Sequence, residues 1–131
     1  MPNTHIEKII ILINKENFVD AEKRIRQLIQ VNPKNYTYQN LLSIVYAKQN
    51  KIDLSIKTLK NIIINNPNFI DAHTNLASII DKKLEYSKAS KLYKKLLKKH
   101  PNNIDLLSNY CHKLISSSKF KESIKILNKL N

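Results

Sequence analysis

The sequence predicts an all-α fold, a single domain over residues 1–131 in which about four helix–turn–helix hairpins, eight helices in all, stack as an α-solenoid. Its landmarks recur every 34 residues, a period typical of stacked helical repeats. Apolar residues between the landmarks follow helical spacing, and no stretch alternates as a strand would. The proline breaks are Asn32-Pro33, Asn66-Pro67 and His100-Pro101, and the small residues in register are Ala21, Ser55, Ala89 and Ser123. The repeats are therefore about 2–35, 36–69, 70–103 and 104–131.

Each repeat is expected to contain two helices, each with one apolar face. In the first repeat the apolar spacing covers 4–15 and 18–31. The proline break stops the second of these helices, because the residue before a proline avoids helical angles. The same pair of helices follows over 36–65 and over 70–99, and the last pair covers 104–130.

The chain contains no glycine, the residue that most easily takes the left-handed conformation at a turn. Asparagine is the usual substitute, and it clusters at the predicted breaks. Asn17 is expected to cap the second helix. Between the two helices of each hairpin, the residues that stand in place of glycine are Glu16, Asn50, Leu84 and Ser118.

These residues resemble the tetratricopeptide repeat, in which a large residue, Leu, a small residue and Tyr on the first helix precede Ala and an aromatic residue on the second helix, and then Pro. The second repeat reads Gln39, Leu42, Ser43, Tyr46, Ser55, Leu59, Pro67; the third reads His73, Leu76, Ala77, Ile80, Ala89, Tyr93, Pro101; the fourth reads Leu107, Tyr110, Cys111, Leu114, Ser123, Leu127. The first repeat departs most, with Lys8 and Ile9 where Leu and a small residue are expected. The resemblance covers nearly the whole chain and implies a right-handed α-solenoid.

The resemblance also implies that the first helices line a concave groove, which would be the binding surface of a non-enzymatic protein-interaction module or scaffold. Asn75 and Asn109 are the leading candidates for contacts with a peptide or protein segment, because an amide side chain both donates to and accepts from a peptide backbone. The alternative is an ordinary solvated face. The other residues that the resemblance places at the groove are Asp71, Asp105, Thr74, Ser78, Ser108, His112, Asn40, Leu41 and Ile44.

The best-known specialised site of this family is a carboxylate clamp for the C-terminal tails of chaperones, built from two basic residues, two asparagines and an arginine. Laid on repeats two to four, this pattern matches only at Asn75, so a chaperone carboxylate clamp is not expected. Asp71 and Asp105 would repel a terminal carboxylate. The unidentified partner is therefore expected to present a neutral or basic peptide.

Lysines with the same period predict a basic ridge along the outer face of the second helices, in a chain whose net charge is +13. This ridge is the basis of an alternative function, an electrostatic adaptor for nucleic acid or an anionic membrane. Aromatic residues are not interleaved with it, so the stacking platform of single-strand binders is missing. A solvated convex face explains the ridge more simply. Its residues are Lys23, Lys57, Lys91 and Lys125, echoed by Arg26, Lys60 and Lys94.

The last predicted helix, 120–130, is expected to present Ile124, Ile126 and Leu127 toward a next repeat or a polar capping helix. Three interpretations stay open. The chain forms a homo-oligomer through this end, a partner covers the face as in an assembly chaperone, or the chain is part of a longer repeat array.

No enzyme, cofactor or metal site is predicted. Cys111 and His112 are adjacent on a helix and point about 100° apart, so they cannot form a nucleophile–base pair with each other. The four histidines lack metal-ligand spacing, and a phosphate loop requires glycine. The single cysteine fits a reducing compartment, and the apolar run at 9–13 is too short for a signal sequence. A cytoplasmic location is expected.

Overall fold

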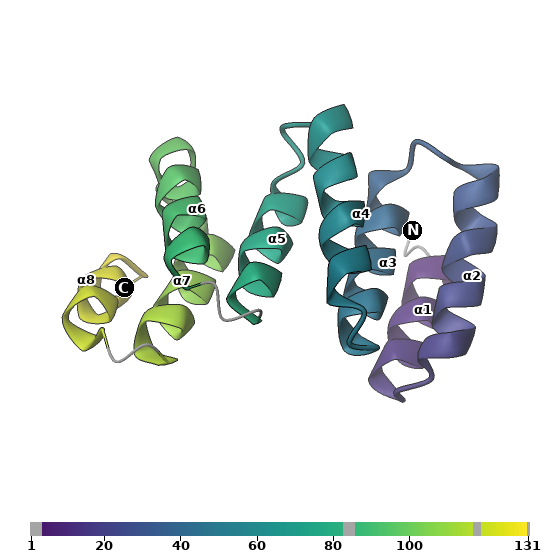
Figure 1. The fold of residues 1–131 in the computed structure, drawn as a ribbon, viewed down its shortest axis with the longest axis horizontal. Coiled ribbons are helices and arrows are strands. Elements are labelled where there is room, and N and C mark those ends of the chain that lie inside the picture. Colours follow the sequence, from purple (N-terminus) through teal and green to yellow (C-terminus); the bar gives the residue numbers. More distant parts are fainter. Residues whose placement is uncertain (1–3, 83–85, 117–118, 131) are drawn as a thin grey trace. The chain divides into compact units, whose positions relative to one another are not determined.

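The computed structural model describes residues 4–82, 86–116 and 119–130, and within these ranges it contains helices and turns but no strand (Figure 1). The all-α prediction is confirmed, and the first helix ends one residue earlier than predicted. The eight helices are α1 (Thr4–Asn14), α2 (Phe18–Val31), α3 (Tyr36–Lys48), α4 (Ile52–Asn65), α5 (Ile70–Lys82), α6 (Tyr86–Lys99), α7 (Ile104–Ser116) and α8 (Phe120–Leu130).

The helices belong to two compact units, Met1–Ala72 and His73–Asn131. In the first unit, α2 packs against both α1 and α3, and α3 packs against α4. In the second unit, α7 packs against both α6 and α8. Each of these packed pairs consists of helices that follow one another in sequence, as stacked hairpins require. The single-domain assignment stays a prediction.

The three proline breaks form the same turn. In each, the residue before the proline ends the preceding helix by donating its N–H to the carbonyl four residues earlier. The N–H three residues further on then donates back to the carbonyl of the residue before the proline, at 3.1, 3.1 and 3.2 Å; the donors are Asn35, Phe69 and Asn103. Because proline suits the second position of such a turn, the repeated sequence signal produces a repeated local geometry.

The turns inside the hairpins use left-handed residues where glycine would be expected. Glu16 has φ 59° and Asn50 has φ 61°. In both turns the left-handed residue donates its N–H to the carbonyl three residues earlier, and the next N–H reaches the carbonyl five residues before it. This is the Schellman pattern that ends many helices. The other two predicted positions, Leu84 and Ser118, lie outside the described residues.

Replacing Glu16 by glycine is expected to raise the free energy of unfolding by about 1 kcal/mol, because a side chain with a Cβ is disfavoured at φ 59°. Asn14→Gly is the matched control, since Asn14 is the last residue of α1 and a glycine within a helix is destabilising. Urea denaturation measures both. A loss of stability in Glu16→Gly would contradict the left-handed turn.

The helix caps agree only in part with the prediction. The side chain of Asn35 accepts a hydrogen bond from the Tyr38 N–H at 3.3 Å, and that of Asn103 accepts one from the Leu106 N–H at 3.0 Å. Asn17 precedes α2, but its side chain makes no cap hydrogen bond. Its amide Nδ2 instead donates to the Asp20 carboxylate at 2.8 Å. Asn17 is therefore the N-cap residue of α2, as expected, but its side chain does not act as the cap.

The small residues that recur in the 34-residue register are buried. In the second repeat the Ser55 hydroxyl donates to the Ser43 carbonyl at 2.7 Å and so joins α4 to α3. In the fourth repeat the Cys111 thiol donates to the Ser123 carbonyl at 3.8 Å, in the opposite direction, and joins α7 to α8. The same pair of repeat positions therefore makes a helix–helix contact in both hairpins. The buried set is Ser43, Ala77, Cys111, Ala21, Ser55, Ala89 and Ser123.

The core of the first unit includes Ile9, the residue that departs from the repeat pattern. Ile9 is completely buried and belongs to one cluster with Ala21, Ile25, Leu42, Val45 and Tyr46. The departure is thus accommodated inside the core. The side chains of Tyr86, Phe120 and Leu130, large apolar residues of the expected helices, lie outside those that the structure describes.

Candidate functional site

The leading groove candidates lie in the second unit. Asn75 is on α5 and Asn109 is on α7, at the same repeat position, and each is half-buried. Ser78 and Ser108 are also half-buried, and His112 is exposed. The first helices of this unit therefore carry amide, hydroxyl and imidazole groups that keep part of their surface accessible.

Two other predicted groove residues, Asn40 and Thr74, are buried, and this corrects their expected exposure. Each stands three residues before a small residue of the helix contact, Ser43 or Ala77. Residues three apart share a helix face, so Asn40 and Thr74 lie on the same buried face as these small residues. The Ser43 hydroxyl also donates to the Asn40 carbonyl at 2.6 Å.

The apolar residues among the predicted groove positions lie on α3 of the first unit. Leu41 and Ile44 are both half-buried. Leu41 packs against the core cluster that contains Ile25 and Leu42. Leu41 therefore contributes to the stability of the fold, and a contact with a partner could use only its remaining surface.

The positions of the two predicted groove aspartates, Asp71 and Asp105, have a local structural explanation. Asp71 lies in the first turn of α5 and Asp105 in the first turn of α7, and both are exposed. A carboxylate in the first turn of a helix is stabilised by the positive end of the helix dipole. Asp71 belongs to the first unit and Asp105 to the second.

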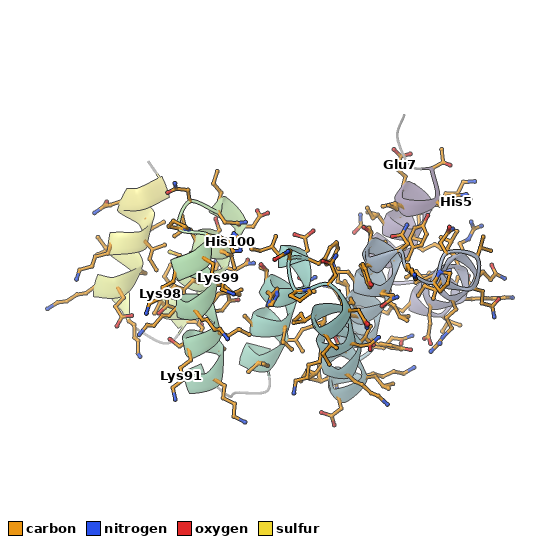
Figure 2. The ribbon with its side chains drawn as sticks, turned by 90° about the horizontal axis from the view of Figure 1, so that it is seen from above. His5, Glu7, Lys91, Lys98, Lys99 and His100 are labelled. Atoms are coloured by element: carbon orange, nitrogen blue, oxygen red, sulfur yellow. The ribbon has the colours of Figure 1, made fainter. Side chains whose placement is uncertain are left out.

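The lysines of the predicted ridge, Lys23, Lys57, Lys60, Lys91, Lys94 and Lys125, are all exposed. The structure adds three that the 34-residue period does not find. Lys95, Lys98 and Lys99 are exposed on α6 beside Lys91 and Lys94, and Figure 2 shows Lys91, Lys98 and Lys99 projecting from this helix. The spacing of three and four residues within 91–99 is the signal that would have found them.

Arg26 is not a free member of the ridge. Its guanidinium pairs with Glu22 at 3.0 Å and donates to the Tyr46 hydroxyl. Lys51 also reaches Glu22, at 3.8 Å, and both cations lie about 6 Å from the centre of the Tyr46 ring, at 5.8 and 6.0 Å. Arg26 thus joins α2 to α3, and Lys51, the residue before α4, also reaches α2 within the first unit, so their role is structural.

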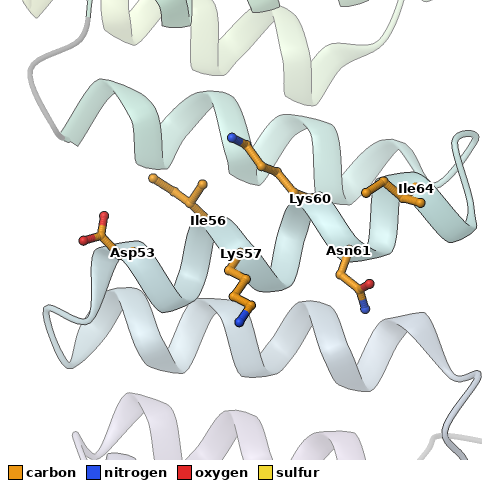
Figure 3. A pocket seen from close by; sticks show the side chains of 6 residues that line it. All are labelled: Asp53, Ile56, Lys57, Lys60, Asn61 and Ile64. Carbon is orange, nitrogen blue, oxygen red and sulfur yellow. The ribbon is translucent and has the colours of Figure 1, made fainter.

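A hollow of about 400 Å³ lies along one face of α4. Lys57 and Lys60 line it, but they point away from each other, so the hollow does not gather two ammonium groups around one point (Figure 3). The remaining lining residues are Asp53, Ile56, Asn61 and Ile64.

Two of the three residues predicted to be exposed on the outer face of α8 are exposed. Ile124 is 55% exposed and Leu127 is 43% exposed, as predicted. Ile126 is buried, so its predicted exposure is wrong. The reason is helical geometry: Ile126 follows Ser123 by three residues and shares the face that meets Cys111 on α7.

Lys113 is a buried residue that sequence reasoning missed. It lies on α7 at the repeat position that Val45 and Ile79 occupy in the second and third repeats, and all three are buried. Comparison of these three residues in register would have revealed the lysine. Its aliphatic stem can pack where the other repeats place an aliphatic side chain.

Within the described residues, no three His, Cys, Asp or Glu side chains come together as a metal site would require. The described helices also include none with the length and apolar content needed to cross a membrane.

Comparison with solved structures identifies the fold. A tetratricopeptide repeat protein from Parabacteroides merdae superposes with a TM-score of 0.71 at 21% identity, over 96% of this chain and 50% of that one. MamA from Desulfovibrio magneticus RS-1 superposes with a TM-score of 0.72 at 16% identity, over 98% of this chain and 73% of that one. The chain thus spans half the length of the Parabacteroides protein. No protein-family model and no curated protein matches the sequence. The fold is that of the tetratricopeptide repeat.

Proposed function

We propose that this chain is a non-enzymatic protein-interaction module that binds a peptide or protein segment along α5 and α7. The observation that carries the proposal is the pair Asn75 and Asn109, which occupy one repeat position on successive first helices and keep part of their surface accessible. A cytoplasmic location fits the single buried cysteine and is part of the proposal.

The chemistry of this face favours recognition of the peptide backbone. An amide side chain satisfies both the N–H and the C=O of an extended segment, whatever side chains that segment carries. Ser78 and Ser108 add hydroxyl groups on the same two helices. Asp105, exposed at the start of α7, favours a neutral or basic segment.

The double variant Asn75→Ala and Asn109→Ala is expected to lower partner recovery at least about tenfold, because two hydrogen bonds of about 1 kcal/mol each are lost. The measurement is quantitative affinity capture from the native cell with wild-type and variant protein side by side. Asn68→Ala with Asn102→Ala is the matched control, since these exposed residues also stand 34 apart. Equal recovery by both variants, with unchanged helicity, would move the binding surface elsewhere.

A specific observation favours a second candidate function. Four lysines, Lys91, Lys94, Lys95 and Lys98, form one exposed stripe along α6, and the helix carries no acidic residue. Such a stripe supports binding of a polyanion, either nucleic acid or an anionic membrane.

If the stripe on α6 neutralises about four phosphates, binding to random-sequence RNA should fall with a log–log salt slope of about −3. Changing these four lysines to glutamine is expected to remove most of this slope. An equal loss of charge in the first unit, at Lys8, Lys15, Lys34 and Lys48, is the control and should leave most of the affinity, since these exposed lysines are outside the predicted ridge. If both variants lose the same affinity, only net charge matters and the stripe is not a site.

A further inference from the structure

One side of α6 is a continuous basic surface. At about 100° per residue, its five exposed lysines fall within an arc of about 140°, and no apolar, acidic or amide residue of α6 falls in this arc. The opposite side carries Ala89, Tyr93 and Leu96, which are buried. The basic side is called the lysine face below; its residues are Lys91, Lys94, Lys95, Lys98 and Lys99.

The stability of the helix does not account for the lysine face. Lysines three or four residues apart repel each other, and α6 has no acidic residue to offset this repulsion. The other second helices differ: Glu22 of α2 pairs with Arg26 at 3.0 Å, and α4 and α8 each carry an acidic residue in the first turn. The helix dipole stabilises Lys98 and Lys99 in the last turn of α6, but its effect does not extend to the other three lysines. A bound polyanion would offset the repulsion along the whole face.

The charges around α6 have the same sign. The unit His73–Asn131 carries thirteen lysines against four acidic residues, and all four lie outside α6. The acidic residues are Asp81, Glu85, Asp105 and Glu122.

A membrane surface suits α6 less well than a nucleic acid. A helix that lies on a membrane inserts its apolar side between the headgroups. On α6 this side is occupied, since Tyr93 stacks on Tyr110 of α7 with ring centres 5.3 Å apart and Leu96 is buried. The Tyr110 hydroxyl also lies 3.3 Å from Ser90 Oγ. Only ammonium groups remain to meet a membrane.

The lysine face has two edges. Lys94 and Lys98 lie along one edge, Lys95 and Lys99 lie along the other about 100° away, and Lys91 lies between them. A helix about 10–12 Å across fits the major groove of B-form DNA, which is about 12 Å wide and has one phosphate strand on either side. The two edges therefore correspond to the two strands.

The number of phosphates also favours a duplex. Residues 91–99 span about 12 Å of helix, and duplex DNA carries one charge per about 1.7 Å, so about seven phosphates lie along this length. A single strand offers about half as many, which is fewer than the five lysines. The lysine face has no aromatic side chain on which an unpaired base could stack. It also has no Arg, Asn or Gln to read base edges, so the contacts are to phosphate and are independent of sequence.

We propose that the lysine face of α6 binds double-stranded DNA, whatever its sequence, by lying in the major groove between the two phosphate strands. This inference rests on the second candidate function, polyanion binding by α6. It does not depend on the face formed by Asn75 and Asn109.

The probe is a fluorescent DNA duplex about two helical turns long, and fluorescence anisotropy measures its binding to the full chain. The expected log–log salt slope is about −4.5, because about five phosphates are neutralised. The same sequence as single-stranded DNA or as an RNA duplex should bind at least about tenfold more weakly. The single strand offers fewer phosphates, and the major groove of A-form RNA is too narrow to admit the helix.

The two edges are tested separately, by Lys94→Gln with Lys98→Gln and by Lys95→Gln with Lys99→Gln. Each double variant loses two phosphate contacts, so each should reduce the size of the salt slope by about 2 and weaken duplex binding at least about tenfold at low salt. Circular dichroism checks that both variants keep their helicity.

Lys34→Gln with Lys48→Gln is the matched control, since it removes two charges from exposed residues of the first unit. It should leave the slope for duplex DNA unchanged. If the control loses as much affinity as the edge variants, only net charge matters and the proposal is wrong. A loss in one edge variant alone would contradict a position between two strands.

The comparison of probes separates this proposal from the function on which it rests. Equal affinity for duplex DNA, single-stranded DNA and duplex RNA would leave polyanion binding in place but overturn the choice of duplex DNA. Tighter binding to vesicles of phosphatidylserine than to the DNA duplex would make a membrane the partner. If the chain binds none of these probes, both the proposal and the second candidate function fail.

Discussion

Ile25→Ala is expected to lower the free energy of unfolding by about 2–5 kcal/mol, whereas Leu127→Ala should cost about 1 kcal/mol or less. The two residues occupy the same repeat position and have side chains of nearly equal size. Ile25 is completely buried in the core cluster of the first unit, so its truncation leaves a cavity. Leu127 is partly exposed on α8, so water replaces what is removed.

The measurement is urea denaturation followed by circular dichroism at constant protein concentration, with the slope compared between variants. Val19→Ala, an exposed truncation on the same helix as Ile25, is the control and should change stability by about 0.5 kcal/mol or less. A cost for Leu127→Ala as large as that for Ile25→Ala would show that the face of α8 is covered in solution.

The second large effect is expected from adding volume at a helix contact. Ala89 on α6 is completely buried at the small-residue position of the third repeat. Leucine there would overpack the contact, at a cost of about 1–3 kcal/mol. The same urea measurement reports it.

Lys91→Leu is the matched control for Ala89→Leu, because it places the same side chain on the exposed face of the same helix. Its expected effect is within about 0.5 kcal/mol. Unchanged stability in Ala89→Leu would show that this position does not face a neighbouring helix, and the 34-residue register would then be wrong.

The sequence alone determined the local structure and its period. Prolines, asparagines and small residues act through their immediate neighbours, so their spacing was sufficient to place the helices and the turns. The three proline turns share one hydrogen-bond pattern. Glu16 and Asn50 take the left-handed conformation at positions where glycine is expected. The burial of Ser43, Ser55 and Ala89 follows from the same register.

The candidate sites could be predicted only to the level of a helix and a repeat position. Asn75 and Asn109 were placed correctly on the first helices, but Asn40 and Thr74 were expected on an accessible face and are buried. The 34-residue period predicted the ridge lysines that recur from one repeat to the next. It did not predict the additional exposed lysines that lie close together along α6. Whether either surface binds a partner stays a prediction.

Only the tertiary structure decided which helix faces are covered. Periodicity states which residues share a face, but the exposure of that face depends on the neighbouring helix. Tyr93 and Leu127 occupy the same repeat position, but Tyr110 covers Tyr93 whereas Leu127 is exposed. Arg26 likewise looked like a surface charge paired at most with Glu22 of its own helix, and only the folded chain brought Tyr46 to it. The sequence determined the repeat, and contacts between residues distant in the chain determined which surfaces are left accessible.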